Sequence, residues 1–379
     1  MTMPAMPETR ATSGVPVLGV LSPMGRGFAL ATLALTLAAI ALEFIVHFGD
    51  KAVVFVVSGL AILGLAWIVG LATERLGALT GPQVGGILNA TFGNVAELII
   101  AFFALQAGLI EVVKASLTGS IIGNLLLVLG ASVFLGGIRH GTQSFDQRVA
   151  GSNAALLVTA AIALVIPAVF AASGSRAEGT LREESVIISV LLIGGYVLSL
   201  IYQFTNPGRT LGAHEPAAGH GGPNWTTRTA VAVLLAAAGL LAVSSEILVG
   251  AIDPFIESVH LSAFFVGVVV IPTIGNLAEH LVAVQLAVKN RMEFAMAVCY
   301  GSSLQVALFV APLLVLAGLV IGQPMDLVFT PLEVAAVGAA VGISALIALD
   351  GESNWLEGAL LMIVYVILAG AFFEVGRPV

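Results

Sequence analysis

The sequence is poor in charge and nearly devoid of cysteine. Of its 379 residues only 9% are charged and 59% are hydrophobic, whereas soluble domains carry roughly a quarter of charged residues. This composition excludes a soluble globular domain. The single cysteine, Cys299, excludes a disulfide within the chain.

Two kinds of catalytic motif are also missing. The chain has no Gly-x-x-x-x-Gly-Lys-Ser/Thr sequence that would bind ATP phosphates, and no His-Glu-x-x-His cluster that would hold a catalytic zinc. We therefore expect a protein that is not an enzyme, is not driven by ATP and needs no cofactor. Its expected surroundings are a lipid bilayer, with no nucleic acid as partner.

Apolar stretches of about 20 residues recur along the whole chain, which is the length that spans a bilayer as a helix. They predict an all-α integral membrane protein with eleven transmembrane helices. The expected spans are 28–47, 52–72, 84–107, 113–137, 149–172, 184–204, 227–250, 259–288, 292–320, 328–349 and 354–374.

The basic residues predict how the chain crosses the membrane. With eleven spans, nine of the 14 lie on the same side as the N-terminus and five on the other. Since Lys and Arg accumulate in cytoplasmic loops, we expect the N-terminus in the cytoplasm and the C-terminus outside. The high content of Ala, Gly and Val suggests a bacterial source, and hence the plasma membrane.

One short motif occurs twice. Gly93-Asn94-Val95-Ala96-Glu97 and Gly275-Asn276-Leu277-Ala278-Glu279 each place a glutamate three residues after a Gly-Asn pair, within an apolar segment. Asn94 and Asn276 are 182 residues apart, and so are Glu97 and Glu279. A carboxylate inside a membrane span is costly and indicates a functional site.

The doubled motif predicts an internal repeat. A polar tail (1–27) and an extra first span (28–47) would precede a five-helix unit (52–204), a polar linker (205–226) and a second five-helix unit (227–374). Because five is odd, the two units must lie in opposite orientations in the membrane. Inverted repeats of this kind are the usual frame of secondary transporters, with the substrate site at the interface of the repeats.

The motif residues suit a hard cation. Asn94 and Glu97 are three residues apart and so share a helix face, as do Asn276 and Glu279. Carboxylate and amide oxygens are ligands for Ca²⁺, whereas softer metals would require clusters of Cys, His or Met. We expect a local break or close helix approach at the glycine before each asparagine, and a distortion near Pro272.

Charge arithmetic suggests a mechanism. Two facing carboxylates carry two negative charges when empty, which is expensive in low dielectric. Either one Ca²⁺ or two protons neutralise the pair, whereas the empty site should not reorient easily. Glu97 and Glu279 would then bind the cation and the protons alternately, which leads to obligatory exchange of Ca²⁺ for H⁺.

These stretches resemble the calcium/proton exchangers of the cation/calcium exchanger superfamily. The resemblance rests on Gly93–Glu97 and Gly275–His280, and extends to Gly119–Gly130, Gly301–Leu308 and Asp350–Gly358. It covers about 28–374. It implies an eleven-span fold with Glu97 and Glu279 as the metal and proton carboxylates. The further residues that it implies, or that polar character within a span suggests, are Asn94, Asn276 and His280 as binding partners and Ser120, Asn124, Ser302, Ser303, Gln305 and Glu246 as residues that line or tune the site.

Several alternatives stay open. The same fold could exchange Na⁺ for Ca²⁺, which His280 disfavours, or H⁺ for Mn²⁺, which also accepts oxygen ligands. A passive cation channel is a further reading, although channels usually build an acidic ring from several subunits. The sequence leaves a homo-oligomer open.

Overall fold

The structure is a computed structural model that describes residues 23–47, 49–172, 178–206 and 225–375. Most of the linker predicted at 205–226 lies outside the described residues. The described part is helical, apart from one pair of two-residue strands.

The first half contains α1 (Pro23–Phe44), α2 (Lys51–Thr80), α3 (Pro82–Phe92), α4 (Val95–Gln106), α5 (Ile110–Ile122), the π-helix η2 (Gly123–Val128), α6 (Leu129–His140), β1 (Gln143–Ser144), α7 (Gln147–Ala172) and α8 (Glu178–Thr205). The second half contains α9 (Thr227–Gly250), α10 (Ile252–Val259), α11 (Ala263–Phe265), the π-helix η3 (Val266–Val270), α12 (Ile271–Val288), α13 (Met292–Gln305), the π-helix η4 (Val306–Val310), α14 (Ala311–Ile321), α15 (Pro331–Ile347), β2 (Glu352–Ser353) and α16 (Trp355–Glu374).

Nine helical stretches in the described part are long and apolar enough to cross a membrane. Two shorter apolar helices, α4 and α15, accompany them. The third expected span falls below the spanning length because a break divides it into α3 and α4. The count of eleven spans stays a prediction, with α3–α4 and α15 as the two spans in question.

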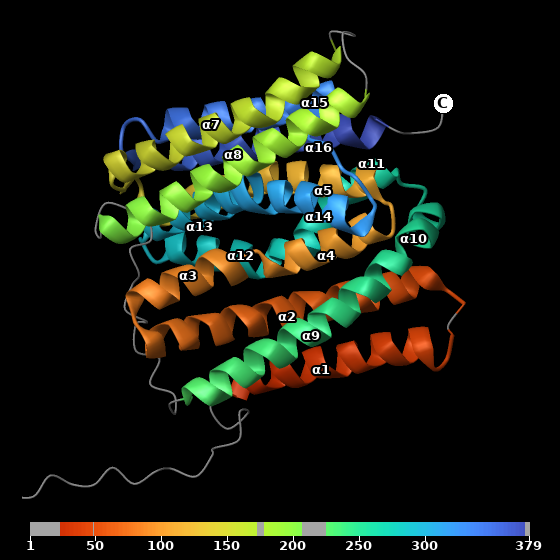
Figure 1. Cartoon of the computed structure of the whole chain (residues 1–379). Coiled ribbons are helices and arrows are strands. Elements are labelled where there is room, and N and C mark those ends of the chain that lie inside the picture. Colours follow the sequence, from red (N-terminus) through yellow and green to blue (C-terminus); the bar gives the residue numbers. More distant parts are fainter. Residues whose placement is uncertain (1–22, 48, 173–177, 207–224, 376–379) are drawn as a thin grey trace, which may run out of the picture.

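The helices run roughly parallel and form layers (Figure 1). One side of the molecule consists of α1, α2 and α9, with α2 and α9 packed along each other. The opposite side holds α7, α8, α15 and α16. The motif-bearing helices α4 and α12 lie between these layers.

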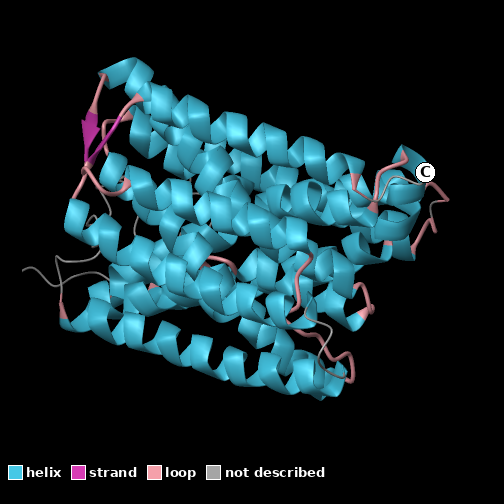
Figure 2. Cartoon of the chain, turned by 90° about the horizontal axis from the view of Figure 1, so that it is seen from above, coloured by secondary structure: helices cyan, strands magenta, loops and turns pink. Residues whose placement is uncertain are grey.

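Contacts at the two ends of the bundle agree with the predicted topology. At one end β1 pairs with β2 (Figure 2), and the Gln143 side chain donates to the Asn290 side chain at 2.9 Å. At the other end Lys114 pairs with Asp326. In the eleven-span arrangement an even number of spans separates the partners in each case, so each pair would lie on one side of the membrane.

The π-helices repeat only in part. η2 and η4 occupy equivalent places in the two halves, at an offset of about 182 residues. The counterpart of η3 at that offset is a stretch of α3 that is α-helical. Short π-helical turns are frequent at functional sites, and all three lie beside the helices that carry the repeated motif.

Helix α16 packs closely on α6 through glycine. A Cβ at Gly358 would lie 2.2 Å from the backbone nitrogen of Phe134 and 2.5 Å from the carbonyl oxygen of Gly130. A Cβ at Gly370, on the same helix, would meet nothing within 4 Å. The two glycines therefore form a matched pair for testing this packing.

We expect Gly358→Ala to lower the stability by about 1–3 kcal/mol, because the added methyl group forces α16 away from α6. Gly370→Ala should leave stability unchanged or raise it by about 0.5–1 kcal/mol, since alanine is the better helix former. Thermal unfolding of the detergent-solubilised protein measures both. Equal melting temperatures for the two variants would contradict the packing described here.

Candidate functional site

The first copy of the motif lies at a helix break. α3 ends at Phe92 and α4 begins at Val95, with Asn94 as the N-cap at φ −105° and ψ 28°. The Asn94 side chain makes no capping bond to α4, so its amide is available for other partners. Glu97 lies in the first turn of α4, where the helix dipole favours a negative charge.

The second copy lies on a continuous helix. α12 runs from Ile271 through Asn276 and Glu279 without interruption, with Pro272 in its first turn. The distortion expected near Pro272 is the π-helix η3, which ends directly before α12. Two nearly identical sequences therefore adopt different backbones, and the expected break is present only at Gly93-Asn94.

Each motif glycine faces the carboxylate of the other motif. A Cβ at Gly275 would lie 2.8 Å from Cγ of Glu97. A Cβ at Gly93 would lie 3.6 Å from Oε1 of Glu279 and 3.2 Å from Oε1 of Gln305. The absence of side chains at these two positions makes room for the glutamates, and places the site at the interface of the two halves.

A chain of hydrogen bonds crosses that interface repeatedly. His280 Nε2 lies 3.1 Å from Asn124 Oδ1, and Asn124 Nδ2 donates to Ser302 Oγ at 3.0 Å. Ser302 Oγ donates to Asn94 Oδ1 at 2.7 Å, and Asn94 Nδ2 donates to Gln305 Oε1 at 2.6 Å. The residues alternate between the second and the first half, so the chain ties the halves together beside the glutamates.

A smaller polar group surrounds Glu97. Asn276 Nδ2 donates to Ser120 Oγ at 3.3 Å, and both side chains lie against the Glu97 carboxylate. On the other side, Ser302 lies against the carboxylate of Glu279. The two carboxylates are close enough for their charges to interact.

Each glutamate has one buried oxygen without a partner among the residues that the structure describes. Oε1 of Glu97 and Oε2 of Glu279 accept no hydrogen bond from this part of the chain. Glu97 is 9% exposed and lines a narrow crevice together with Ser120 and Pro272. Unsatisfied buried acceptors are costly, and a bound cation or proton would satisfy both oxygens.

The donor set suits a hard cation. The described residues hold no group of three or more His, Cys, Asp or Glu that could bind a resident metal ion. The oxygens at the site come from two carboxylates and from neighbouring amides and hydroxyls, which are ligands that Ca²⁺ accepts.

Two of the predicted site residues lie apart from this group. Ser303 is fully buried, and its hydroxyl donates to the Cys299 carbonyl oxygen of its own helix. Glu246 is exposed on α9. The other predicted residues come together around Glu97 and Glu279: Asn94, Ser120, Asn124, Asn276, His280, Ser302 and Gln305.

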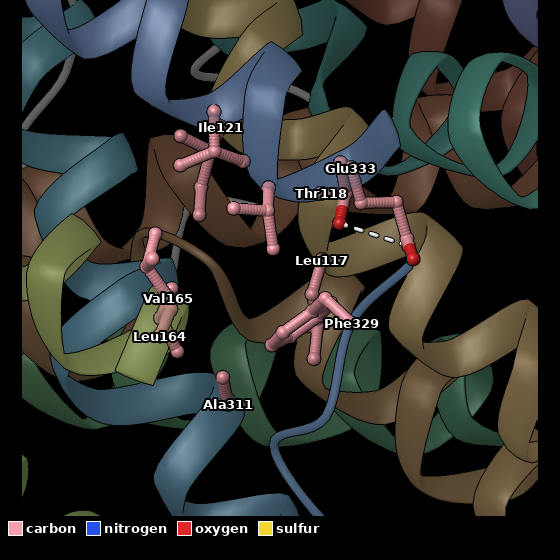
Figure 3. A pocket seen from close by; sticks show the side chains of 10 residues that line it. Leu117, Thr118, Ile121, Leu164, Val165, Ala311, Phe329 and Glu333 are labelled. Atoms are coloured by element: carbon pink, nitrogen blue, oxygen red, sulfur yellow. Dashed lines mark hydrogen bonds between the residues drawn. The ribbon is translucent and has the colours of Figure 1, made fainter. Parts of the chain in front are cut away.

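Sequence reasoning did not single out a third buried carboxylate, Glu333. It is 2% exposed and accepts a hydrogen bond from the Thr118 hydroxyl at 3.1 Å, at the edge of an apolar pocket (Figure 3). Its other oxygen accepts from the backbone of Thr330 in a capping box. The Thr330-Pro331-Leu332-Glu333 pattern is the signal that could have identified it.

Comparison with known proteins places these features in a family. The model of the sodium/calcium exchanger protein family matches residues 51–205 and 229–373. A Ca²⁺/H⁺ antiporter of Synechocystis sp. is 46% identical over 355 residues, covering 88% of this chain and 94% of that protein. The Ca²⁺/H⁺ antiporter ChaA of Bacillus subtilis is 42% identical over 333 residues, covering 85% and 92%.

Solved structures agree in fold. The structure of native YfkE is 39% identical, covers 91% of this chain and 99% of its own, and superposes with a TM-score of 0.79. The H⁺/Ca²⁺ exchanger CAX superposes with a TM-score of 0.70 at 15% identity, covering 93% of each chain. The latter likeness shows the fold alone.

The glycine that faces Glu97 provides a test of the site. We expect Gly275→Ala to weaken Ca²⁺ binding about tenfold or more, because a Cβ would displace the Glu97 side chain at a cost of about 1–3 kcal/mol. Gly301→Ala is the control, since a Cβ there meets nothing within 4 Å, and it should change affinity by no more than about twofold. Isothermal titration in detergent measures both, and equal affinities would contradict the geometry.

Proposed function

The chain belongs to the sodium/calcium exchanger protein family, in its Ca²⁺/H⁺ exchanger branch, and from this premise we propose that it exports cytoplasmic Ca²⁺ in exchange for H⁺. The sequence-based predictions of a helical membrane protein and of a secondary transporter rather than an enzyme are confirmed by these relatives. Ca²⁺ and H⁺ are the substrates, and Ca²⁺ is cargo rather than a cofactor.

The observation that carries the mechanism is the pair of unsatisfied oxygens on Glu97 and Glu279. With the site empty, two carboxylates at membrane depth carry two uncompensated negative charges, which low dielectric makes expensive. One Ca²⁺ or two protons remove that charge. Only the loaded forms then cross between the two faces of the membrane, and this couples the two fluxes.

The remaining residues support this pair. Asn94, Asn276, Ser120 and Ser302 supply amide and hydroxyl oxygens near the cation, since each lies against a carboxylate or in the bonded chain. Asn124, Gln305 and His280 orient those groups through the alternating hydrogen bonds. The Ser303 hydroxyl donates to a backbone carbonyl of its own helix and takes no part in these alternating hydrogen bonds.

The membrane setting follows from the same premise. The distribution of basic residues supports a cytoplasmic N-terminus, and relatives in bacteria support a place in a bacterial plasma membrane. In that orientation the proton gradient across the plasma membrane supplies the energy for Ca²⁺ export. The five-helix units 52–204 and 227–374, in opposite orientations, would provide the two faces of the site.

Substituting either glutamate should abolish coupled transport. We expect Glu97→Gln and Glu279→Gln each to lower Ca²⁺ uptake at least about tenfold, because one carboxylate cannot neutralise the divalent cation in low dielectric. The measurement is ⁴⁵Ca²⁺ uptake into proteoliposomes under an imposed pH gradient. Glu333→Gln is the matched control, because this buried carboxylate lies outside the site and Gln preserves its capping box. Wild-type rates in the two site variants would contradict the proposal.

The counter-ion needs a separate measurement, because the family model is named for sodium. We expect uptake to follow a pH gradient, to collapse with a protonophore and to ignore an imposed Na⁺ gradient. Uptake that follows Na⁺ instead would assign the Na⁺/Ca²⁺ alternative. Ca²⁺ flux that needs neither gradient would indicate a channel, and competition by Mn²⁺ at equal concentration would extend the substrate to that ion.

A further inference from the structure

An apolar groove lies behind the helix that carries Glu97. It is lined by Leu98, Ile99, Phe102 and Phe103 of α4, Ala242 of α9, and Leu313, Leu314 and Ala317 of α14, and it has a volume of about 470 Å³. None of these side chains has a polar group. The volume falls within the range of sites that hold a small molecule.

The groove exists because α9 and α14 do not pack against each other. α4 packs along α9 on one side and along α14 on the other, whereas α9 and α14 make little contact with each other. Figure 1 shows α4 between α9 and α14. The alanines at positions 242 and 317 are too small to close the gap.

Membrane depth decides what can occupy it. Ala242 lies eight residues before the end of α9 at Gly250, which is about 12 Å along the helix axis, and so within the hydrocarbon zone. Water in such a groove would find no hydrogen-bond partner. Hydrocarbon from the surrounding bilayer needs no such partner.

A carboxylate lies one helix turn beyond the residues that line the groove. Glu246 follows Ala242 by four residues on α9, and therefore lies on the same helix face one turn nearer the membrane surface. It is exposed, and no hydrogen bond or ion pair involves it among the described residues. About 6 Å from the helix end, its side chain reaches the depth of lipid headgroups.

We propose that this groove binds one acyl chain of a bilayer phospholipid and that Glu246 selects a lipid with a cationic amine headgroup. The apolar walls accept the chain, and the carboxylate complements an ammonium group such as that of phosphatidylethanolamine while repelling an anionic headgroup. The site is separate from the cation site, because Glu97 and Ala101 face the crevice on the other side of α4.

The first experiment uses native mass spectrometry of the intact protein, purified from vesicles with equal amounts of phosphatidylethanolamine and phosphatidylglycerol. We expect phosphatidylethanolamine to be retained in preference, by up to about fivefold, the scale of one exposed ion pair. Glu246→Gln should abolish the preference without loss of lipid, and Ala317→Phe should reduce total retention by filling the groove. Retention of phosphatidylglycerol in preference would overturn the headgroup assignment.

The second experiment places the chain in the groove. In protein whose tryptophans at 67, 225 and 355 are replaced by Phe, a Phe102→Trp reporter should be quenched by brominated acyl chains with a higher relative association constant than a Val366→Trp reporter. Val366 is the control because it is 66% exposed on α16. Equal quenching at the two positions would overturn the proposal. A cross-link between two copies of a Phe102→Cys variant would also overturn it, because it would assign the groove to a second protomer. Neither readout depends on Ca²⁺ transport.

Discussion

The structure depends on the cost of placing negative charge where water cannot reach it. Glu97 and Glu279 lie between the outer layers of helices, and each keeps a buried oxygen that the protein does not satisfy. A protein built for stability alone would pair such groups, as Glu333 is paired with Thr118 and its own helix cap. The contrast separates the two carboxylates that we propose as the cation site from a carboxylate whose oxygens are satisfied within the fold.

The site is a product of the interface rather than of either half. Gly275 makes room for Glu97, Gly93 faces Glu279, and the bonded amides alternate between the halves. A rearrangement of one half against the other must therefore change the surroundings of both carboxylates together. The coupling that we propose needs such a shared response, because a cation site held within one half would not sense the other half.

Much of this site can be predicted from sequence, because a carboxylate in an apolar segment has few explanations and its duplication at one fixed offset removes most of them. Glu97, Glu279 and the asparagines before them were predicted as site residues on that ground, and the structure brings them together.

The backbone could not be predicted: Gly93-Asn94 breaks a helix while the identical Gly275-Asn276 continues one. That difference arises from packing around each segment. The pairing of His280 with Asn124 and the π-helices likewise depend on contacts between segments far apart in the chain, and Glu246, predicted from its polar character alone, lies apart from the site.

The short length of α4 has a consequence for synthesis of the chain. This helix has 12 residues with Glu97 in its first turn, so it is too short to span a bilayer without α3. Its neighbours α2 and α5 belong to the first half, whereas α9, α12 and α14 belong to the second half and are translated later. The ribosome therefore delivers Glu97 to the membrane before it has made Asn276 and Gly275, which lie against the Glu97 side chain in the folded protein.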